Sequence, residues 1–205
     1  IGLGLRRAVL DQLLVETAAE LGAVIHLSCR IEKLCRIAHG WDFKIKEESW
    51  QAKVLIGADG RNSWVAQQLG LNRSAAIQGR SVGFQSRLRC AGMTRREIQI
   101  HLFPGGYAGI VELGDGTITL GMAIEKRRLG RERGADFVFN KLAQNTYLKE
   151  IIERSNGAAQ LSSVYPVYFP KRRSFTEHAL LVGDAARVSE PVTGNRHDMA
   201  KLKGS

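Results

Sequence analysis

Several features are scarce or missing in this chain of 205 residues. No stretch approaches the ~18 consecutive apolar residues that a membrane-spanning helix needs, and no basic-then-apolar signal peptide opens the sequence. The three cysteines, Cys29, Cys35 and Cys90, are an odd number without CxxC spacing, so neither a disulfide framework nor a metal site is expected. There is no internal repeat and no low-complexity tract. These absences predict a soluble protein of the reducing cytoplasm.

The charge, in contrast, is strongly positive: 30 Lys and Arg against 20 Asp and Glu give a net charge of +10. Such an excess favours anionic partners and is compatible with a peripheral membrane contact. The basic residues, however, form short clusters such as Lys126-Arg127-Arg128, and none is interleaved with aromatic residues as a base-stacking surface requires. We predict no nucleic-acid partner, and a basic nucleic-acid module is the weakest alternative.

Apolar periodicity outlines an α/β order in the first part of the chain. Leucines at three-and-four spacing predict a helix over residues 10–21, and Gly22 ends it. Residues 23–27 are predicted as a strand, followed by a hairpin around His39-Gly40. A compact apolar strand at residues 54–56 then leads through a turn into an amphipathic helix.

After residue 71 the pattern becomes rich in strands. Ile118, Leu120, Met122 and Ile124 alternate with smaller or polar residues, which is typical of a half-buried strand, and Gly114-Asp115-Gly116 predicts a hairpin. The predicted strands here are 81–89, 97–103, 107–113, 117–124 and, after two helices at 135–145 and 147–154, 161–169. A last apolar strand at 179–182 returns to the first pattern. We therefore expect one domain from residues 1–72 and 177–205, interrupted by a second from 73–176.

Two similar strand ends carry the chemistry: VLIGADGRNS, ending at Ser63, and LLVGDAARVSEP, ending at Pro191. Each is an apolar strand followed by glycine, aspartate and a helix start. Ligands of open α/β sheets bind beyond the carboxyl ends of strands, where glycine allows close approach and aspartate accepts hydrogen bonds from sugar hydroxyls. Either aspartate alone is explained by helix capping. The pair, on either side of a β-rich insert, favours a binding site.

In this order the motifs resemble the DG and GD motifs of the FAD-dependent monooxygenase and geranylgeranyl reductase superfamily. The opening helix, with Arg7 four residues before Asp11, and the segment HLFPGGYAGIVELGDGTITLGMA are also similar to that superfamily. The resemblance implies a glutathione-reductase-like FAD-binding domain with an inserted antiparallel β-sheet substrate domain. It further implies that Asp184 binds the ribityl chain of FAD, with Gly183, Pro191 and Gly194 shaping the turn beside the flavin.

The resemblance also implies roles in the first part of the chain. Asp59 and Gly60 would support the cofactor site and the approach of NAD(P)H, and Arg7 would contact the flavin side. His101, on the alternating face of a strand, and Tyr107, after two glycines, are the candidates for the substrate site. No catalytic side chain is assigned, because the flavin itself carries the redox chemistry.

Three departures from the family pattern affect this interpretation. Gly2 and Gly4 have the first spacing of a GxGxxG turn, but Arg7 stands where the third glycine would fall, and no strand precedes them. We therefore interpret the sequence as a fragment without the unit that binds the ADP half of FAD. Ala66 stands in place of the arginine that closes the first motif, which weakens the interpretation as a hydroxylase. In addition, the segment PVTG is not followed by a further glycine.

The sequence thus predicts an FAD-dependent oxidoreductase that moves hydride from NAD(P)H through the flavin to an apolar or prenyl-like substrate. One alternative is an FAD-dependent aromatic or polyketide-type monooxygenase. Another is a truncated, non-catalytic fragment of such an enzyme.

Overall fold

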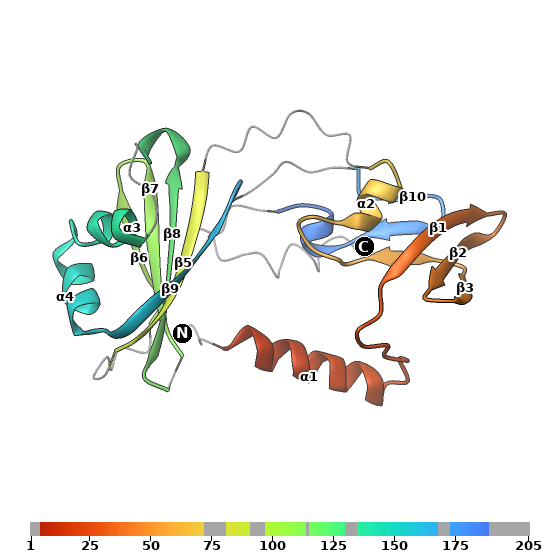
Figure 1. Cartoon of the computed structure of the whole chain (residues 1–205), viewed down its shortest axis with the longest axis horizontal. Coiled ribbons are helices and arrows are strands. Elements are labelled where there is room, and N and C mark those ends of the chain that lie inside the picture. Colours follow the sequence, from red (N-terminus) through yellow and green to blue (C-terminus); the bar gives the residue numbers. More distant parts are fainter. Residues whose placement is uncertain are drawn as a thin grey trace. The chain divides into compact units, whose positions relative to one another are not determined.

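The computed structural model describes residues 5–71, 81–90, 97–113, 115–129, 135–167 and 173–188. The chain divides into two compact units (Figure 1). The first combines Ile1–Thr17 with Gly79–Val167, and the second combines Ala18–Gln78 with Tyr168–Ser205.

An antiparallel sheet of five strands, in the order β6-β7-β8-β5-β9, forms the first unit. The alternation in the sequence predicted its strands, although β9 begins five residues earlier than expected and ends at Val164. The predicted hairpin is formed by β7 and β8. In its turn, the Thr117 N–H donates a hydrogen bond to the Asp115 carboxylate over 3.0 Å. Gly114 of this turn and residues 168 and 169 of the last predicted strand lie outside the described residues. The strands are β5 (Ser81–Arg89), β6 (Gln99–Phe103), β7 (Gly106–Glu112), β8 (Thr117–Glu125) and β9 (Asn156–Val164).

Helices α3 (Ala135–Leu142) and α4 (Thr146–Arg154) lie against one face of this sheet (Figure 1). Alternate residues of β7 and β8 bury their side chains there, so that Ile110, Ile118 and Ile124 are at most 2% exposed. Asn145 begins α4 by accepting a hydrogen bond from the backbone of Leu148 over 3.1 Å. Hydrophobic burial between sheet and helices therefore provides the core of this unit.

The second unit contains two small sheets. One is the meander β1 (Ile31–Ile37), β2 (Gly40–Ile45) and β3 (Glu48–Ala52). The other has the order β10-β11-β4 and consists of β10 (Phe175–Thr176), β11 (Ala179–Leu181) and β4 (Leu55–Gly57). Trp41 joins them: its indole N–H donates to the His178 carbonyl over 2.8 Å, while its ring packs in the core that includes Leu55 and Leu181. An ion pair between Arg36 and Glu177 lies at the same junction.

Helix α1 (Arg7–Glu20) is followed by a turn at Gly22, whose φ of +94° suits glycine. No residue of α1 is buried. The strand predicted at residues 23–27 is wrong: these residues form no ladder, and Val24 and Leu27 are 80% and 77% exposed. An apolar segment becomes a strand only where a neighbour pairs its backbone groups, and within the described residues it has no such neighbour.

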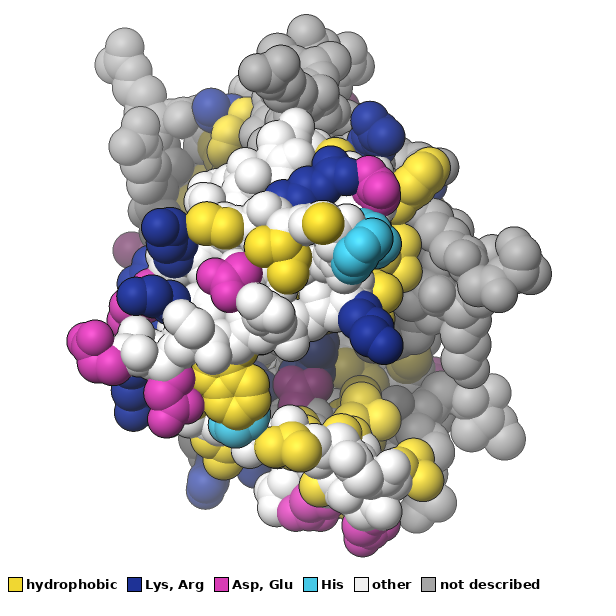
Figure 2. Space-filling model, turned by 90° about the vertical axis from the view of Figure 1, so that its right-hand side faces the viewer, with side chains coloured by type: hydrophobic (Ala, Val, Ile, Leu, Met, Phe, Trp, Pro, Cys, Tyr) yellow, Lys and Arg dark blue, Asp and Glu magenta, His cyan; other side chains and the backbone are white. Residues whose placement is uncertain are grey.

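The described helices include none that is long and apolar enough to cross a membrane. On the face drawn in Figure 2, Lys and Arg side chains are interspersed with acidic and hydrophobic ones. This distribution agrees with the scattered charge in the sequence.

Gly57 allows close packing in the core of the second unit and provides a test of it. A Cβ at this position would lie 2.7 Å from Leu181 Cδ2 and 2.9 Å from Val65 Cγ1. We expect Gly57→Ala to lower the free energy of unfolding by about 1–3 kcal/mol, because the overpacked core must shift. The control is Gly121→Ala, since no described atom lies within 4 Å of that Cβ position. Equal denaturant midpoints for the two variants would contradict the packing argument.

Candidate functional site

The two glycine–aspartate turns lie side by side at one edge of a sheet. Strand β4 (Leu55–Gly57) pairs in parallel with β11 (Ala179–Leu181), with Gly57 opposite Leu181. Immediately beyond the ladder, Val182 N–H donates to the Gly57 carbonyl over 2.9 Å. Asp59 and Asp184 follow within a few residues, so both turns leave the carboxyl edge of the same two strands. This edge is where open α/β sheets bind their ligands.

Each turn also contains a glycine in the left-handed region, with φ of +79° at Gly60 and +56° at Gly183. Other residues are strained in this conformation. Among the described residues, no atom lies within 4 Å of the Cβ position of either glycine. The backbone of both turns is therefore open to close approach by another molecule.

Asp59 is tied to the helix that follows it, α2 (Trp64–Gln68). Its carboxylate accepts a hydrogen bond from the Val65 N–H over 3.0 Å and another from the Ser63 hydroxyl. Burial alone would raise the pKa of Asp59, but the hydrogen bonds from Ser63 and from backbone N–H groups outweigh it, so the pKa lies below its ordinary value of 3.8. Asp59 thus stays ionised and fixes the shape of the first turn.

Asp184 sits in a tighter turn. The sequence predicted a helix start after β11, but the chain forms a short 3₁₀ turn, Gly183–Ala185, closed by hydrogen bonds from Ala186 and Arg187 to the Gly183 carbonyl. Ala185 is fully buried, whereas Asp184 is half-buried. The turn therefore anchors its small residue in the core and leaves the acidic one at the surface of the unit.

The remaining residues expected in this site are Pro191, Gly194 and Arg7. Pro191 and Gly194 lie outside the described residues. Arg7 belongs to the first unit, at the exposed start of α1, where its Nε donates to Asp11 over 2.6 Å. This ion pair has the spacing that stabilises a helix turn, and the flavin contact of Arg7 stays a prediction.

The two substrate candidates lie on opposite faces of the five-stranded sheet. His101 is opposite Ala108 in the β6–β7 ladder, and Tyr107 is opposite Leu102. His101 therefore faces the helices, where its ring stacks on Tyr147 of α4 with centroids 5.5 Å apart, and burial lowers its pKa. Tyr107 points to the other face. One pocket on one face cannot be lined by both side chains.

Sequence reasoning did not single out Ser63, which is 1% exposed and joins the first turn to α2. Its hydroxyl accepts from the Ala66 N–H over 2.9 Å and bonds to the Asp59 carboxylate. The signal was present, because serine directly before an apolar helical segment is typical of an N-cap. Ala66, the departure from the family motif, is fully buried in the core of the second unit.

The comparisons with known proteins support the interpretation from motifs. No family model matches the chain. It is 27% identical over its whole length to the digeranylgeranylglycerophospholipid reductase of Methanosarcina acetivorans, and 29% identical, over 95% of its length, to that of Methanothrix thermoacetophila. The resemblance to the reductases is thereby confirmed. The chain spans about half the length of these curated relatives, 52% and 50% respectively.

Solved structures show the same fold. A flavoprotein/dehydrogenase from Cytophaga hutchinsonii superposes with a TM-score of 0.82 over 98% of this chain and 52% of its own, at 13% identity. The flavin-dependent halogenase CmlS superposes with a TM-score of 0.80 over 97% of this chain and 38% of its own, at 18% identity. The chain therefore has the α/β fold of FAD-dependent oxidoreductases, including the predicted antiparallel sheet.

The hydrogen bond between Ser63 and Asp59 gives a prediction about the first turn. We expect Ser63→Ala to raise the pKa of Asp59 toward its ordinary value, since a donor to the ionised form is lost. Loss of the cap should also cost about 0.5–2 kcal/mol of stability. Because the folded pKa of Asp59 is depressed, its contribution to stability is present above the ordinary pKa and is lost as the pH falls through the folded value. A carboxyl NMR titration measures the shift.

Asn145→Ala is the matched control, because it removes a cap from α4 in the other unit. It should lower stability by a similar amount without moving the titration of Asp59. An unchanged Asp59 titration in Ser63→Ala would contradict the assignment of this bond.

Proposed function

We propose that this chain is part of an FAD-dependent oxidoreductase. It would supply the turns that lie beside the flavin and the sheet that receives the substrate. The single observation that carries the proposal is the parallel pairing of β4 with β11, which brings the two open glycine–aspartate turns to one edge. The names of the curated relatives agree with it, and one solved neighbour, the halogenase PltM, is described in complex with phloroglucinol and FAD.

The residues of the turns fit such a cofactor. In this proposal Asp184 accepts hydrogen bonds from the ribityl hydroxyls, and Gly183 lets the cofactor approach its backbone, which a side chain at this left-handed position would obstruct. Pro191 and Gly194, predicted beside the flavin, complete the assignment. Asp59 fixes the shape of the neighbouring turn through its hydrogen bonds, and Gly60 leaves the backbone of that turn open to the cofactor. When bound, the flavin supplies hydride transfer, and the protein provides its placement and the electrostatics around it.

We further propose that NAD(P)H is the electron donor and that the substrate is apolar or prenyl-like. The five-stranded sheet of the first unit is the part that receives the substrate. Of the two residues predicted there, Tyr107 lies on the sheet face opposite the helices, and His101 faces α4. We therefore keep Tyr107 as the substrate candidate.

Reduction is the favoured reaction and oxygenation the second candidate. The curated relatives are named reductases, whereas the halogenase neighbours share the fold at 18% identity or less. The hydroxylase-type motif has an arginine at position 66, whereas this chain has a fully buried alanine there. No charged side chain from that position can therefore contact the cofactor or the substrate.

Asp184→Ala is expected to weaken FAD binding by about ten- to hundredfold, since a hydrogen bond to a charged acceptor contributes about 1.5–3 kcal/mol. The measurement is a titration of the purified protein with FAD, followed by quenching of flavin fluorescence. Asp136→Ala, which removes an exposed acid from the first turn of α3, is the control and should bind FAD like the parent. Equal affinity of the Asp184 variant and the parent would overturn the role of the second turn.

Dependence on oxygen separates the two reactions. With FAD and NAD(P)H supplied, a reductase saturates prenyl double bonds under anaerobic conditions, whereas a monooxygenase forms product only when O₂ is admitted. We expect turnover without oxygen, measured as loss of double bonds by mass spectrometry. Product that appears only in air would favour the monooxygenase.

A further inference from the structure

Strand β6 is an outer strand of the five-stranded sheet. It pairs with β7 on one side, and no described strand lies on its other side (Figure 1). The backbone groups on that side can therefore pair with a further strand, which proteins usually prevent with lysine, proline or a bulge in the edge strand. The segment EIQIHLF, residues 97–103, contains neither lysine nor proline, and its ladder with β7 runs without a register shift. The β6 edge thus keeps the geometry that pairing needs.

Alternate side chains of this segment point to the face opposite α3 and α4, which we call the open face. They are Ile98, Ile100 and Leu102, and they are 55%, 50% and 77% exposed. The side chains between them point to the helices, where Phe103 packs against the core. Three large apolar side chains in a row at the rim of a sheet form an exposed patch of the kind that marks an interaction surface.

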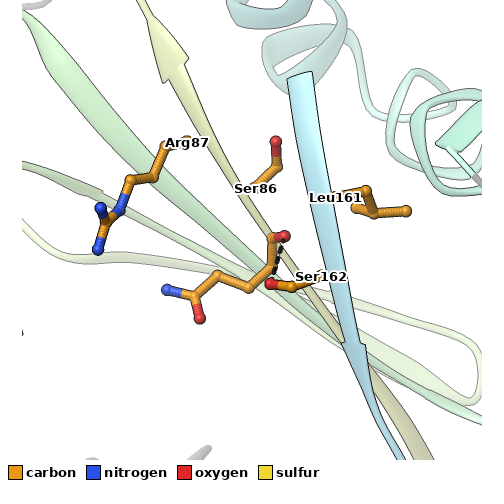
Figure 3. A pocket seen from close by; sticks show the side chains of 5 residues that line it. Ser86, Arg87, Leu161 and Ser162 are labelled. Carbon is orange, nitrogen blue, oxygen red and sulfur yellow. Dashed lines mark hydrogen bonds between the residues drawn. The ribbon is translucent and has the colours of Figure 1, made fainter. Parts of the chain in front are cut away.

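The opposite edge of the sheet, formed by β9, has a different character. Its exposed residues Ser162 and Ser163 are polar. The Ser162 hydroxyl donates to the Gln85 carbonyl over 3.3 Å and lines a hollow together with Arg87 (Figure 3). The run of exposed apolar side chains is therefore specific to the β6 edge.

The β6 segment is complementary to a second copy of itself in the antiparallel direction. When Ile100 lies opposite Ile100 of the second copy, Ile98 lies opposite Leu102. The apolar side chains of the two copies then form one continuous stripe along the open face. On the helix side Gln99 lies opposite His101, so no two like charges meet. Such pairing about a two-fold axis is the commonest arrangement of homodimers.

The charges at the two ends of the segment match in the same register. Glu97 lies at its start on the helix side, where the Gln99 amide donates to the carboxylate over 2.9 Å. Lys141 of α3 lies at the other end, with its Nζ 5.8 Å from the centre of the Phe103 ring. Glu97 and Phe103 are separated by about 20 Å of extended strand, so the two charges of one chain are too far apart to pair. In the antiparallel register Glu97 lies opposite Phe103 of the second copy, and so beside its Lys141.

We propose that two copies of this protein associate through β6, by antiparallel strand pairing that joins their five-stranded sheets. The two-fold axis passes beside Ile100, and two ion pairs between Glu97 and Lys141 of the other copy fix the register. A strand pair of this length is small for a protein interface, so the association is reversible and depends on protein concentration. It involves the edge of the sheet and is independent of the proposed cofactor and substrate.

Cysteine cross-linking tests the register. In the paired state Ile100→Cys places two cysteines opposite each other, with Cβ atoms about 4.5–5.5 Å apart, which is close to the separation in a disulfide. Leu102→Cys is the matched control: Leu102 is the more exposed residue, but its two copies lie about 14 Å apart along the strands. We expect a covalent dimer of Ile100→Cys on mild oxidation, measured on a non-reducing gel. Leu102→Cys should stay at the level of the parent, whose exposed Cys29 sets the background.

A charge exchange tests the ion pairs and identifies the partner as a second copy. Glu97→Lys and Lys141→Glu each bring like charges together, so each should raise the dimer Kd about tenfold, measured by sedimentation velocity over a concentration series. The double variant brings opposite charges together again and should return the Kd to near the parent value. The control is Val164→Lys at the β9 edge, where Val164 is 37% exposed; its dimer Kd should equal that of the parent.

Ile100→Lys places two positive charges at the axis and should leave only the monomer. Its Tm should stay at the parent value, because the side chain at this position is half exposed. Three outcomes would overturn the proposal: a parent that stays monomeric at every concentration, equal cross-linking of Ile100→Cys and Leu102→Cys, or a double charge variant that associates no better than the single ones. A monomeric parent whose Tm falls in Ile100→Lys would show that another part of the polypeptide covers the β6 edge instead.

Discussion

The parallel pairing of β4 with β11 is the contact on which the candidate site depends. Three residue pairs and the hydrogen bond from Val182 to Gly57 join segments that lie on either side of the whole β-rich insert. Without this ladder the turns at Asp59 and Asp184 would be two unrelated loops. Parallel strands need a crossover connection, and here the insert and its flanking segments supply it. The long separation in sequence is thus a direct requirement of the site.

Close packing beneath the two turns stabilises the β4–β11 ladder. Gly57 brings β4 against Val65 of α2 and Leu181 of β11. The buried Ser63 fixes the start of α2 and the carboxylate of Asp59 at once. Trp41 then joins the meander to the β10–β11 turn through its bond to His178. Asp59 therefore has a structural role in shaping its turn, apart from any contact with a ligand.

The two faces of the five-stranded sheet differ in composition and in burial. One is mainly apolar and closed by α3 and α4, and its buried side chains form the core of the first unit. The other is graded from Ile100 to Arg87 and interrupted by Gly109 and Gly121. Glycines in central strands usually weaken a sheet. Here Gly109 and Gly121 lie opposite each other on the open face and leave it without side chains at that point. Alternate residues of the same strands therefore form the core on one face and an open surface on the other.

Much of this could be predicted from local pattern, and the failures have identifiable causes. Strands β5 to β8 were predicted closely, because a half-buried strand alternates visibly. Strand β3 was missed: four of its five side chains are exposed, so it shows no alternation. Residues 23–27 were wrongly predicted as a strand, because apolar composition does not reveal whether a partner is present. The placement of His101 and Tyr107 on opposite faces could not be predicted, because alternation along a strand does not say which face the helices cover.

The sequence by itself determined the α/β order, the strands of the insert, the two glycine–aspartate turns and the resemblance to flavin-dependent reductases. Each of these is encoded by residues close together in the chain. The tertiary structure alone decided that the two turns share an edge and that Asp59 is held by Ser63. It also decided that His101 and Tyr107 lie on opposite faces. These facts depend on strand pairing and register between distant segments, and register decides the face of every side chain in a strand.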